Sequence, residues 1–447
     1  MKLKTALLAM PVAAALLITT ACSGESDPKA SDSPAGKASG TTEKFEGRGP
    51  INYVSSRDAS GAARESIDRW NAAHPDEQVT WIELPDSADQ QRQQMVQNAQ
   101  IKSDTFSVLN LDVVWTTEFA ANKWIMELPQ DTIPAGRMLQ GPVDAASYRD
   151  KLYAVPYYTD GGLLYSRTDL MTAAGVEAPK TWAEMKAACD KILALPEAAG
   201  MSCYVGQFDK NEALTVNFTE AVASAGGHIL NKDGQPDVDT PEALAGLTQL
   251  QAAFKENMVP SDAITYLEEQ GRRAFQEGKV VFMRNWPFVH ASLSATDGSS
   301  QVNGKFGISP LPGIGGHAGV STLGGRNLAI SPFTQNKATA LDFIKFFTSE
   351  EESMLRTEKS SRAPVYPSIL NDPKVVEKRP HYPTLLKSLQ NAEPRPKVIA
   401  YGATTQVIQE EVYAVLTGTK EPKKALEDMQ KRLKDCLLYT SPSPRDS

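Results

Sequence analysis

The sequence lacks the marks of most enzyme and nucleic-acid-binding classes. It contains neither the phosphate-binding motif GxxxxGK[ST] nor the GxSxG motif of serine hydrolases. Only five histidines occur in 447 residues, and no two of them have the spacing of a metal site. A net charge of −8 argues against the basic surface that nucleic acid requires. We therefore expect no catalytic residues, no metal, no cofactor and no nucleic-acid partner.

Long hydrophobic runs are also scarce, and the only one that approaches membrane length opens the chain. Lys2 and Lys4 precede the apolar stretch Leu7–Ile18, which is too short to cross about 30 Å of hydrocarbon. Residues 1–21 therefore predict a secretory signal peptide. The next residue is Cys22, as in a bacterial lipobox, although Thr19 stands where that motif usually has Leu. We expect a lipidated Cys22 that anchors the chain, with an ordinary cleaved signal as the alternative.

Both ends of the chain carry segments that we exclude from the fold. Residues 22–49 have almost no large apolar side chain and predict a flexible tether. Residues 436–447, CLLYTSPSPRDS, break the helical pattern before them and resemble a translated sequencing adapter. The folded part is therefore expected between residues 50 and 435.

Cysteine is rare as well, with four in the whole chain. Cys22 and Cys436 lie in the two excluded segments, which leaves Cys189 and Cys203. In an exported protein, two remaining cysteines that are close in sequence favour a disulfide. Free buried thiols are the alternative.

The folded part exceeds one ordinary core, so two lobes are expected. Its first part alternates strands at Ile51–Val54, Val79–Leu84 and Val108–Trp115 with helical patterns. This order predicts a parallel sheet covered by helices. Ligands of such sheets bind beyond the carboxyl ends of the strands.

Charged residues occupy those strand ends. Arg57 and Asp58 follow the first strand, and Asp112 and Glu118 lie in and after the third. A charge inside the apolar third strand is costly unless it is paired or faces a wet cleft. We interpret Asp112 as a ligand acceptor, with a salt bridge or a helix cap as the alternative.

A second candidate region is Tyr153–Asp169, which reads YAVPYYTDGGLLYSRTD. Tyr157 presents a flat ring with a polar tip, and the carboxylate of Asp160 accepts hydrogen bonds from hydroxyls or amines. The pair Gly161-Gly162 lets the backbone bend or lie close to a ligand. The simpler interpretation is a core strand followed by a surface turn.

Trp286 is the third candidate, because an aromatic side chain at a strand end suits stacking on the apolar face of a sugar. Its neighbour Asn285 offers hydrogen bonds to hydroxyls at the rim of such a ring. The alternative is a tryptophan half-buried under a loop.

Two strands are predicted after this region. Phe306–Leu311 is expected to return to the first lobe, and a strand that ends at Ile330 follows Gly324, Gly325 and Arg326. The glycine-rich stretch Gly313–Gly319 predicts a flexible loop, because no helix follows it as dinucleotide binding requires.

Five motifs follow one another along the chain. They are LDVVWTTEFAANKW (Leu111–Trp124), YAVPYYTDGGLLYSRTDL (Tyr153–Leu170), FMRNWPF (Phe282–Phe288), LGGRNLAIS (Leu323–Ser331) and PRP…Y (Pro394–Tyr401). With the lipobox and the tether, this set resembles the extracytoplasmic solute-binding lipoproteins of carbohydrate ABC importers, in the branch similar to trehalose- and maltose-binding proteins (family 1).

The resemblance implies an α/β, two-lobed periplasmic-binding-protein fold (type II). Each lobe is then a mainly parallel sheet covered by helices, with a hinge and a ligand cleft between the lobes. The first lobe would comprise residues 50–158 and 291–358, and the second residues 159–290 and 359–435. The resemblance also implies capture of a di- or oligosaccharide and its delivery to the permease subunits of an ABC transporter. The protein would be a monomer, anchored by its lipid to the outer face of the cell membrane of a Gram-positive actinobacterium.

Carried over by position, the resemblance gives roles to individual residues. Asp112 and Asp160 would accept hydrogen bonds from sugar hydroxyls, Trp286 would stack on a ring, and Arg395 would donate to hydroxyls. The Gly324-Gly325 backbone would border the site. The remaining expected contacts are Arg57, Asp58, Glu118, Tyr157, Asn285 and Arg326. Relatives often have an aromatic residue at the position of Arg326, so an acidic or otherwise modified sugar becomes conceivable as ligand.

Two other functions stay open at this point. The same fold would also suit a polyamine or a peptide, since the acids Asp112 and Asp160 match amines. A secreted glycoside hydrolase would need two carboxylates that flank one glycosidic bond. Asp112, Glu118 and Asp160 supply carboxylates, but no sequence feature marks an acid/base pair.

Overall fold

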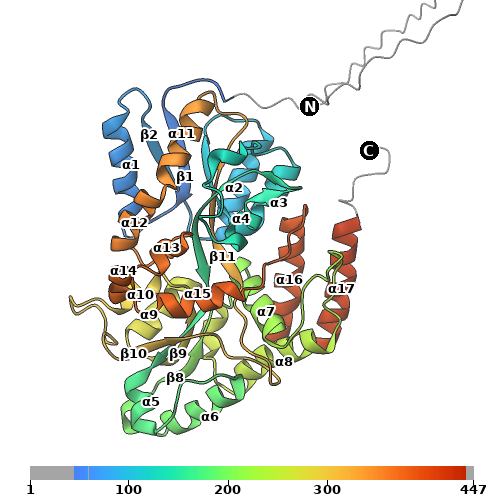
Figure 1. The fold of residues 1–447 in the computed structure, drawn as a ribbon. Helices are drawn as coiled ribbons and strands as arrows, with labels where there is room; N and C mark the ends of the chain where they lie inside the picture. Colours follow the sequence, from blue (N-terminus) through green and yellow to red (C-terminus); the bar gives the residue numbers. More distant parts are fainter. Residues whose placement is uncertain (1–44, 59, 439–447) are drawn as a thin grey trace, which may run out of the picture. The chain divides into compact units, whose positions relative to one another are not determined.

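The computed structural model of this chain describes residues 45–58 and 60–438 (Figure 1). The expected signal peptide, Cys22 and most of the tether lie outside the described residues, as do residues 439–447 of the tail. Contacts divide the chain into Met1–Thr42 and a second unit, Glu43–Ser447, which carries every element described below.

The described residues contain strands of two to eight residues. They are β1 (Ile51–Ser56), β2 (Val79–Leu84), β3 (Val108–Asp112), β4 (Ser147–Tyr148), β5 (Lys151–Leu152), β6 (Val155–Gly161), β7 (Leu163–Arg167), β8 (Ser202–Val205), β9 (Val280–Asn285), β10 (Phe306–Ser309) and β11 (Leu323–Ile330).

Helices make up most of the remaining regular structure. The α-helices are α1 (Ala62–Ala73), α2 (Ala88–Gln100), α3 (Thr116–Ala121), α4 (Gln140–Ala145), α5 (Thr168–Ala174), α6 (Trp182–Ile192), α7 (Glu212–Ser224), α8 (Pro241–Lys255), α9 (Glu268–Gln276), α10 (Val289–Leu293), α11 (Lys337–Phe347), α12 (Glu350–Lys359), α13 (Pro367–Leu370), α14 (Pro373–Lys378), α15 (Tyr382–Gln390), α16 (Tyr401–Leu416) and α17 (Pro422–Leu438). Short 3-10 helices are η1 (Val113–Trp115), η2 (Gln130–Thr132), η3 (Pro196–Ala198) and η4 (Ser261–Thr265).

The first sheet has the strand order β2-β1-β3-β11-β6. β1 pairs in parallel with β2 and β3, which confirms the expected strand–helix–strand–helix–strand start. β11, however, is antiparallel to both β3 and β6. Strands β1, β2, β3 and β6 therefore run in one direction and β11 alone runs against them, so the expectation of a mainly parallel sheet is confirmed for this half, apart from the one strand that enters from the other lobe.

The second sheet has the order β10-β7-β9-β8. β8 and β9 are parallel, whereas β7 is antiparallel to both β9 and β10, so this sheet is mixed as well. The expected return of Phe306–Leu311 to the first lobe is wrong, because β10 pairs with β7. The chain enters the first sheet again only at β11. The other lobe boundaries expected from the sequence stay predictions.

Two crossing segments, Gly161–Leu163 and Ser321–Leu323, connect the sheets side by side. Strand β6 ends at Gly161 and β7 begins at Leu163, so Gly162 alone separates them. The backbone N–H of Gly162 donates a hydrogen bond of 2.6 Å to Oγ of Ser321. Leu323 lies opposite Gly161 in the β11–β6 ladder. This paired connection is where a change in the angle between the two lobes has to be absorbed.

Helices cover both sheets (Figure 1). On the first sheet, α1 packs with α11 and α12, and α2 packs on β3. In the second lobe, α7 and α8 pack together, and the red C-terminal helices α16 and α17 lie against them (Figure 1). Helix α17 runs three residues past Asp435, the expected end of the folded part, and the origin of the tail stays a prediction.

Helix caps appear where the sequence supplies them. The Thr181 hydroxyl accepts from the backbone N–H of Glu184 at 3.1 Å, and the Glu184 carboxylate accepts from the backbone N–H of Lys180 at 2.7 Å. At α7, the apolar pattern indicates a helix only from Asn217. The structure starts α7 at Glu212, because the Asn211 side chain accepts from the N–H of Ala213 at 2.8 Å.

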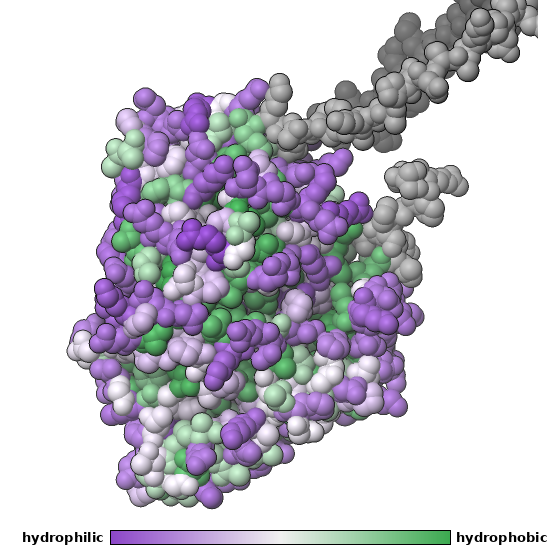
Figure 2. Space-filling model, viewed as in Figure 1, coloured by the Kyte–Doolittle hydropathy of each residue, from purple (hydrophilic) through white to green (hydrophobic). Residues whose placement is uncertain are grey.

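The surface is largely hydrophilic, with interrupted hydrophobic patches on the face that Figure 2 shows. Among the described residues, the exposed large hydrophobic side chains are Ile101 and Leu355. None of the helices in this part of the chain combines the length and the apolar character that a membrane crossing demands. Within the same residues, no group of three or more His, Cys, Asp or Glu side chains is arranged to hold a metal ion.

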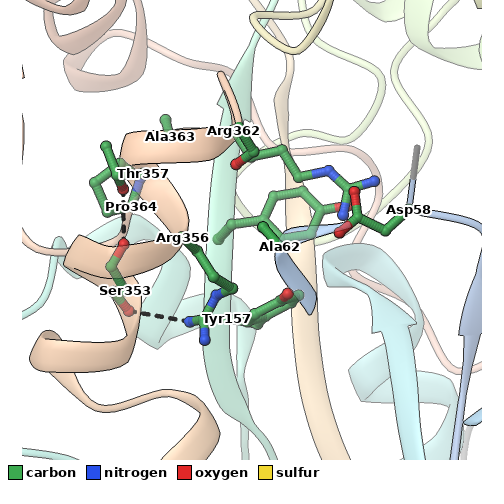
Figure 3. A pocket seen from close by; sticks show the side chains of 11 residues that line it. Asp58, Ala62, Tyr157, Ser353, Arg356, Thr357, Arg362, Ala363 and Pro364 are labelled. Carbon is green, nitrogen blue, oxygen red and sulfur yellow. Dashed lines mark hydrogen bonds between the residues drawn. The ribbon is translucent and has the colours of Figure 1, made fainter. Parts of the chain in front are cut away.

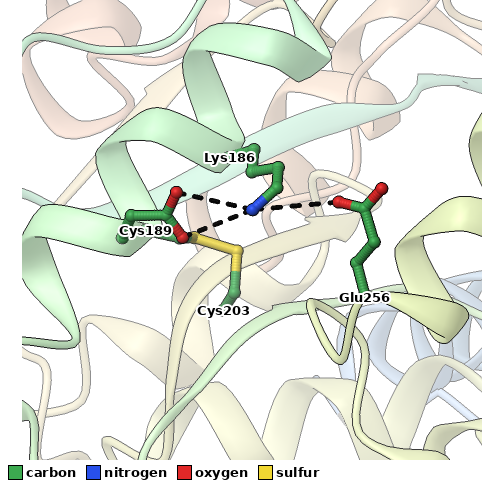
Figure 4. Close-up of a disulfide and its surroundings, with 5 residues drawn as sticks. Lys186, Cys189, Cys203 and Glu256 are labelled. Carbon is green, nitrogen blue, oxygen red and sulfur yellow. Dashed lines mark hydrogen bonds and ion pairs between the residues drawn. A yellow bond between two sulfur atoms is a disulfide. The ribbon is translucent and has the colours of Figure 1, made fainter.

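Cys189 of α6 and Cys203 of β8 form a disulfide, with their Cα atoms 5.5 Å apart (Figure 4). The bridge closes a loop with a sequence separation of 14 residues and ties a helix to the edge strand of the second sheet. Lys186 lies close by, within 3.4 Å of Asp190 and 3.8 Å of Glu256. The structure thus contains the bridge rather than two free thiols.

Candidate functional site

One face of the first sheet carries four of the expected ligand contacts, Asp112, Asp160, Gly324 and Arg326. Arg326 of β11 lies opposite Asp112 of β3 and Tyr158 of β6, and Gly324 lies opposite Asp160. Residues two apart on a strand point to the same face, and so do residues directly opposite in a ladder. These five residues therefore share one face, which we call the binding face.

Arg395 closes one end of the binding face by joining the two lobes. Its guanidinium donates to Asp112 at 2.5 and 3.3 Å and to Glu212, the first residue of α7, at 2.6 Å. Glu212 also accepts from the hydroxyls of Tyr401 and, at 2.7 Å, Thr405. Arg395, Asp112 and Glu212 are 4%, 9% and 3% exposed, so this network is buried. We call it the Arg395 network.

The charged states of Glu212 and Arg395 are stabilised by their oppositely charged neighbours against the effect of burial. Burial raises the pKa of Glu212, and Arg395 opposes that shift. Burial by itself lowers the pKa of Arg395, but Asp112 and its other neighbours raise it well above its ordinary value. Asp112 also caps η1 by accepting from the N–H of Val114 at 3.2 Å. Both features of the simpler interpretation of Asp112, a salt bridge and a helix cap, are therefore present, and its role as ligand acceptor stays a prediction.

Trp286, Asp160 and Gly324 form a second group on the binding face, which we call the Trp286 cluster. A Cβ atom placed on Gly324 would lie 2.9 Å from the ring of Trp286 and 3.2 Å from Cβ of Asp160. No side chain fits there without displacing the indole. Glycine at this position therefore lets the ring from the second lobe rest directly on the backbone of β11.

Asp160 has an acceptor atom that nothing in the described residues satisfies. Its Oδ1 atom is buried and has no hydrogen-bond partner among the described residues. Burial raises the pKa of Asp160 to about 7, although Arg362 and Arg326 act in the opposite direction. A buried carboxylate oxygen without a donor is costly, and a ligand hydroxyl would satisfy it.

Asn285 and Glu268 orient the indole of Trp286. The amide of Asn285 donates to the backbone oxygen of Glu268 at 3.1 Å, and its Oδ1 accepts from the N–H of Trp286 at 2.8 Å. The indole N–H donates to the Glu268 carboxylate at 3.4 Å. Asn285 is fully buried, so its contacts are internal, and its expected role at the rim of a sugar stays a prediction.

Glu118 is engaged by partners from two parts of the chain. Arg92 of α2 donates to both of its oxygens, at 2.8 and 2.5 Å, and the N–H of Gly402 approaches it at 3.4 Å. In this arrangement Glu118 joins the first lobe to the start of α16 rather than offering a free acceptor.

Arg362 and Asp58 face each other across a small pocket beside the start of α1 (Figure 3). Asp58 accepts from the N–H of Ala63 at 2.9 Å and from the Ser60 hydroxyl at 2.6 Å, so it also starts α1. Arg362 lies 4.9 Å from the ring centre of Tyr158, and its guanidinium donates no hydrogen bond to the described residues. The pocket volume of about 20 Å³ suits one water molecule.

Tyr157 and Arg57 lie away from the binding face. Tyr157 is buried on the opposite face of β6, where it stacks on Phe347 at 5.1 Å and lies under Arg356 at 4.8 Å. Arg57 is exposed at the end of β1. Their expected ligand contacts stay predictions.

Glu212, Arg362 and the pair Arg284–Glu220 were missed by sequence reasoning. Glu212 follows Asn211 at a helix start, where no apolar periodicity marked it in the sequence. Arg284 stands between apolar residues in the FMRNWPF motif, and such a charge inside a buried strand is a usable signal.

Comparisons with known proteins point to one family. A family model for bacterial extracellular solute-binding proteins matches residues 54–354. A Deinococcus radiodurans protein named "Probable ABC transporter-binding protein" is 30% identical over 383 residues, covering 83% of this chain and 89% of the relative. The structure of maltose-bound T. maritima MalE3 matches with a TM-score of 0.82 and 33% identity, over 87% of this chain and 100% of that chain. The GacH receptor of Streptomyces glaucescens, at 22% identity and a TM-score of 0.78 over 88% and 99%, shares the fold.

Proposed function

Because the chain belongs to the bacterial extracellular solute-binding protein family, we propose that it captures a di- or oligosaccharide of the trehalose or maltose type and delivers it to an ABC importer. Members of this family bind solutes, so the protein is not an enzyme. The absence of catalytic motifs from the sequence agrees with this assignment.

The observation that carries the proposal is the Trp286 cluster. An indole ring with an unpartnered carboxylate beside it matches the two sides of a sugar, which has apolar C–H faces and a rim of hydroxyls. The two groups come from different sheets, so a ligand between them would hold the lobes together. The maltose bound to the MalE3 relative supports a sugar of this size.

The finer parts of the proposal concern anchoring. We infer that Cys22 carries lipid, that residues 23–49 act as a tether, and that the binding protein works as a monomer at the outer face of the cell membrane of a Gram-positive actinobacterium. The lipobox-like sequence before Cys22 and the polar composition of the tether support this. Mass spectrometry of the mature protein tests it, and an unmodified Cys22 or cleavage elsewhere would contradict it.

The proposed ligand class is tested by isothermal titration of the purified protein with trehalose, maltose, sucrose, cellobiose, maltodextrins and a uronic-acid sugar. We expect micromolar or tighter binding to at least one of them. Trp286→Ala should weaken that binding by about 1–3 kcal/mol, because it removes the aromatic platform. A folded protein that binds none of these sugars would contradict the proposal.

A polyamine is disfavoured by the charges around the site. Arg326 and Arg362 both act on Asp160, and neither guanidinium has a carboxylate within ion-pair distance among the described residues. Two guanidinium groups without a close ion-pair partner beside the acceptor would repel an amine. Heat from titration with spermidine, together with silence from the sugar panel, would reverse this preference.

Asp160→Asn should stabilise the free protein while weakening sugar binding. The carboxyl is protonated up to pH about 7 in the folded state and ionised above about 4 when unfolded, so Asp160 lowers the free energy of unfolding as the pH rises. At pH 8 the variant should be more stable by about 1–3 kcal/mol. Sugar affinity should fall at the same time, because an amide is a weaker acceptor than a carboxylate.

Urea unfolding at pH 8 and titration with the best sugar of the panel measure the two effects. Asp169→Asn is the matched control, because Asp169 is ion-paired with Arg167 at the far end of β7 and lies outside the binding face. A variant that binds sugar as well as the wild type would remove Asp160 from the site.

A further inference from the structure

A buried ion pair, Arg284–Glu220, lies between the Trp286 cluster and the crossing segments. Glu220 of α7 accepts from Nε of Arg284 at 2.8 Å and from Nη2 at 2.6 Å. The remaining guanidinium nitrogen donates to Gln207 at 3.0 Å, and the amide of Gln207 returns a bond of 3.0 Å to the backbone oxygen of Arg284. Arg284 is 1% exposed and Glu220 is 5% exposed. All three side chains belong to the second lobe.

One side of this pair contacts the indole of Trp286, on which the proposed sugar would stack. The guanidinium carbon of Arg284 lies 4.0 Å from the centre of the Trp286 ring, in cation–π geometry. The backbone oxygen of Trp286 accepts from the Tyr165 hydroxyl at 3.0 Å. With the guanidinium against one part of its surface and Gly324 against another, the ring has little freedom to move independently of Arg284.

The other side of the pair touches both crossing segments. The Glu220 oxygen that binds Nη2 also accepts from the backbone N–H of Thr322 at 3.2 Å. A Cβ atom on Gly162 would lie 2.5 Å from that same oxygen and 2.8 Å from Nη2 of Arg284. Gly162 therefore leaves room for the ion pair to lie directly against the connection between β6 and β7.

We propose that Arg284 and Glu220 are positioning residues that couple the Trp286 platform to the hinge, so that a sugar stacked on Trp286 favours closure of the lobes. The inference rests on the proposed function and adds the route by which binding reaches the crossing segments. A shift of the indole displaces the guanidinium of Arg284, which contacts it. The two hydrogen bonds of the ion pair pass this displacement to Glu220, and Glu220 passes it to the backbone N–H of Thr322. The proposal predicts that removal of the pair separates sugar contact from closure.

The main test compares the wild type with the double variant Arg284→Met/Glu220→Leu. Replacing both partners avoids an unpaired buried charge and preserves the approximate volume. We expect the affinity for maltose and trehalose, measured by titration, to fall by about 5- to 150-fold, the usual range of coupling between sites. At saturating sugar, interlobe distances from spin labels should remain longer than in the wild type.

Amide exchange at Thr322 gives a readout that needs no sugar. Its N–H is held by Glu220 in the wild type, so exchange should accelerate in the double variant. The matched control is Arg167→Met/Asp169→Asn, which removes a pair with a 2.6 Å contact at the other end of β7. This control should leave affinity, closure and Thr322 exchange unchanged.

The outcomes separate the two proposals. If the wild type binds no sugar but Thr322 exchange accelerates, the ligand class is wrong while the attachment of the pair to the hinge holds. Unchanged exchange, or weaker binding with full closure, would overturn the coupling. Should the double variant fail to fold, Arg284→Lys takes its place: it keeps the charge but loses the planar group under the indole. Wild-type affinity and closure in Arg284→Lys would likewise overturn the proposal.

Discussion

Arg395→Met should lower the free energy of unfolding by about 3–5 kcal/mol at pH 7 in the absence of sugar. The substitution leaves Asp112 and Glu212 buried without their common cation, and breaking a buried ion pair from one side has a cost of this size. The two carboxylates would then also repel each other. Urea unfolding followed by circular dichroism measures the loss.

Two further variants show which contacts account for the loss of unfolding free energy. Asp112→Asn removes the partner in the first lobe and keeps the Arg395–Glu212 pair, so it should cost less than Arg395→Met and mainly increase opening of the lobes. Lys151→Met removes an exposed pair with Glu127 and should change stability by no more than about 1 kcal/mol. A loss below about 1 kcal/mol in Arg395→Met would mean that the lobes open in solution and that water replaces the network.

The sequence predicted the fold best where local patterns repeat. The strand–helix alternation from β1 to β3 was readable, because each apolar strand is followed by an amphipathic helix. The direction of β11 and the sheet to which β10 belongs were not readable. Those properties depend on pairing between segments that are more than a hundred residues apart, such as Phe306 opposite Arg167. No local periodicity carries that information.

The candidate site shows the same limit at the level of single residues. A charge in an apolar strand correctly marked Asp112 as special, but not that its partner would be Arg395, 283 positions away. The two-residue repeat of a strand puts Tyr158 on the same face as Asp160 and Tyr157 on the other, but only the structure shows that the face of Tyr157 packs on Phe347. The pairing of side chains across the lobes required the structure.

Lowering the pH from 7 to 5 should reduce stability through His290 and His381. Their rings stack at 4.1 Å between α10 and the start of α15, and three of their four nitrogens are buried without partners in the described residues. Burial lowers the pKa of His290 to about 4 and that of His381 to about 2, with Arg379 contributing to both. Both rings are thus neutral at pH 5 in the folded state and charged in the unfolded state, whose pKa is near 6.5.

This difference fixes the sign and the size of the effect. The contribution of each histidine is fully present above pH 6.5 and is lost as the pH falls toward the folded-state value, by about 1.4 kcal/mol per pH unit. Between pH 6.5 and pH 5, the two histidines together lower the free energy of unfolding by about 4 kcal/mol. Asp160 works in the opposite direction, because its raised pKa makes the folded state more stable on acidification. Wild-type stability alone would therefore understate the effect of the histidines.

The double variant His290→Asn/His381→Asn isolates the histidine contribution, because amides do not titrate and Asp160 is unchanged. Urea unfolding at pH 7 and at pH 5 should show a wild-type loss that exceeds the loss in the variant by about 4 kcal/mol. Equal losses in the two proteins would mean that water or a cation reaches the stacked rings in solution. Since α15 packs on β6, acid loosening of this pair would begin beside the strand that carries Asp160 into the first crossing segment.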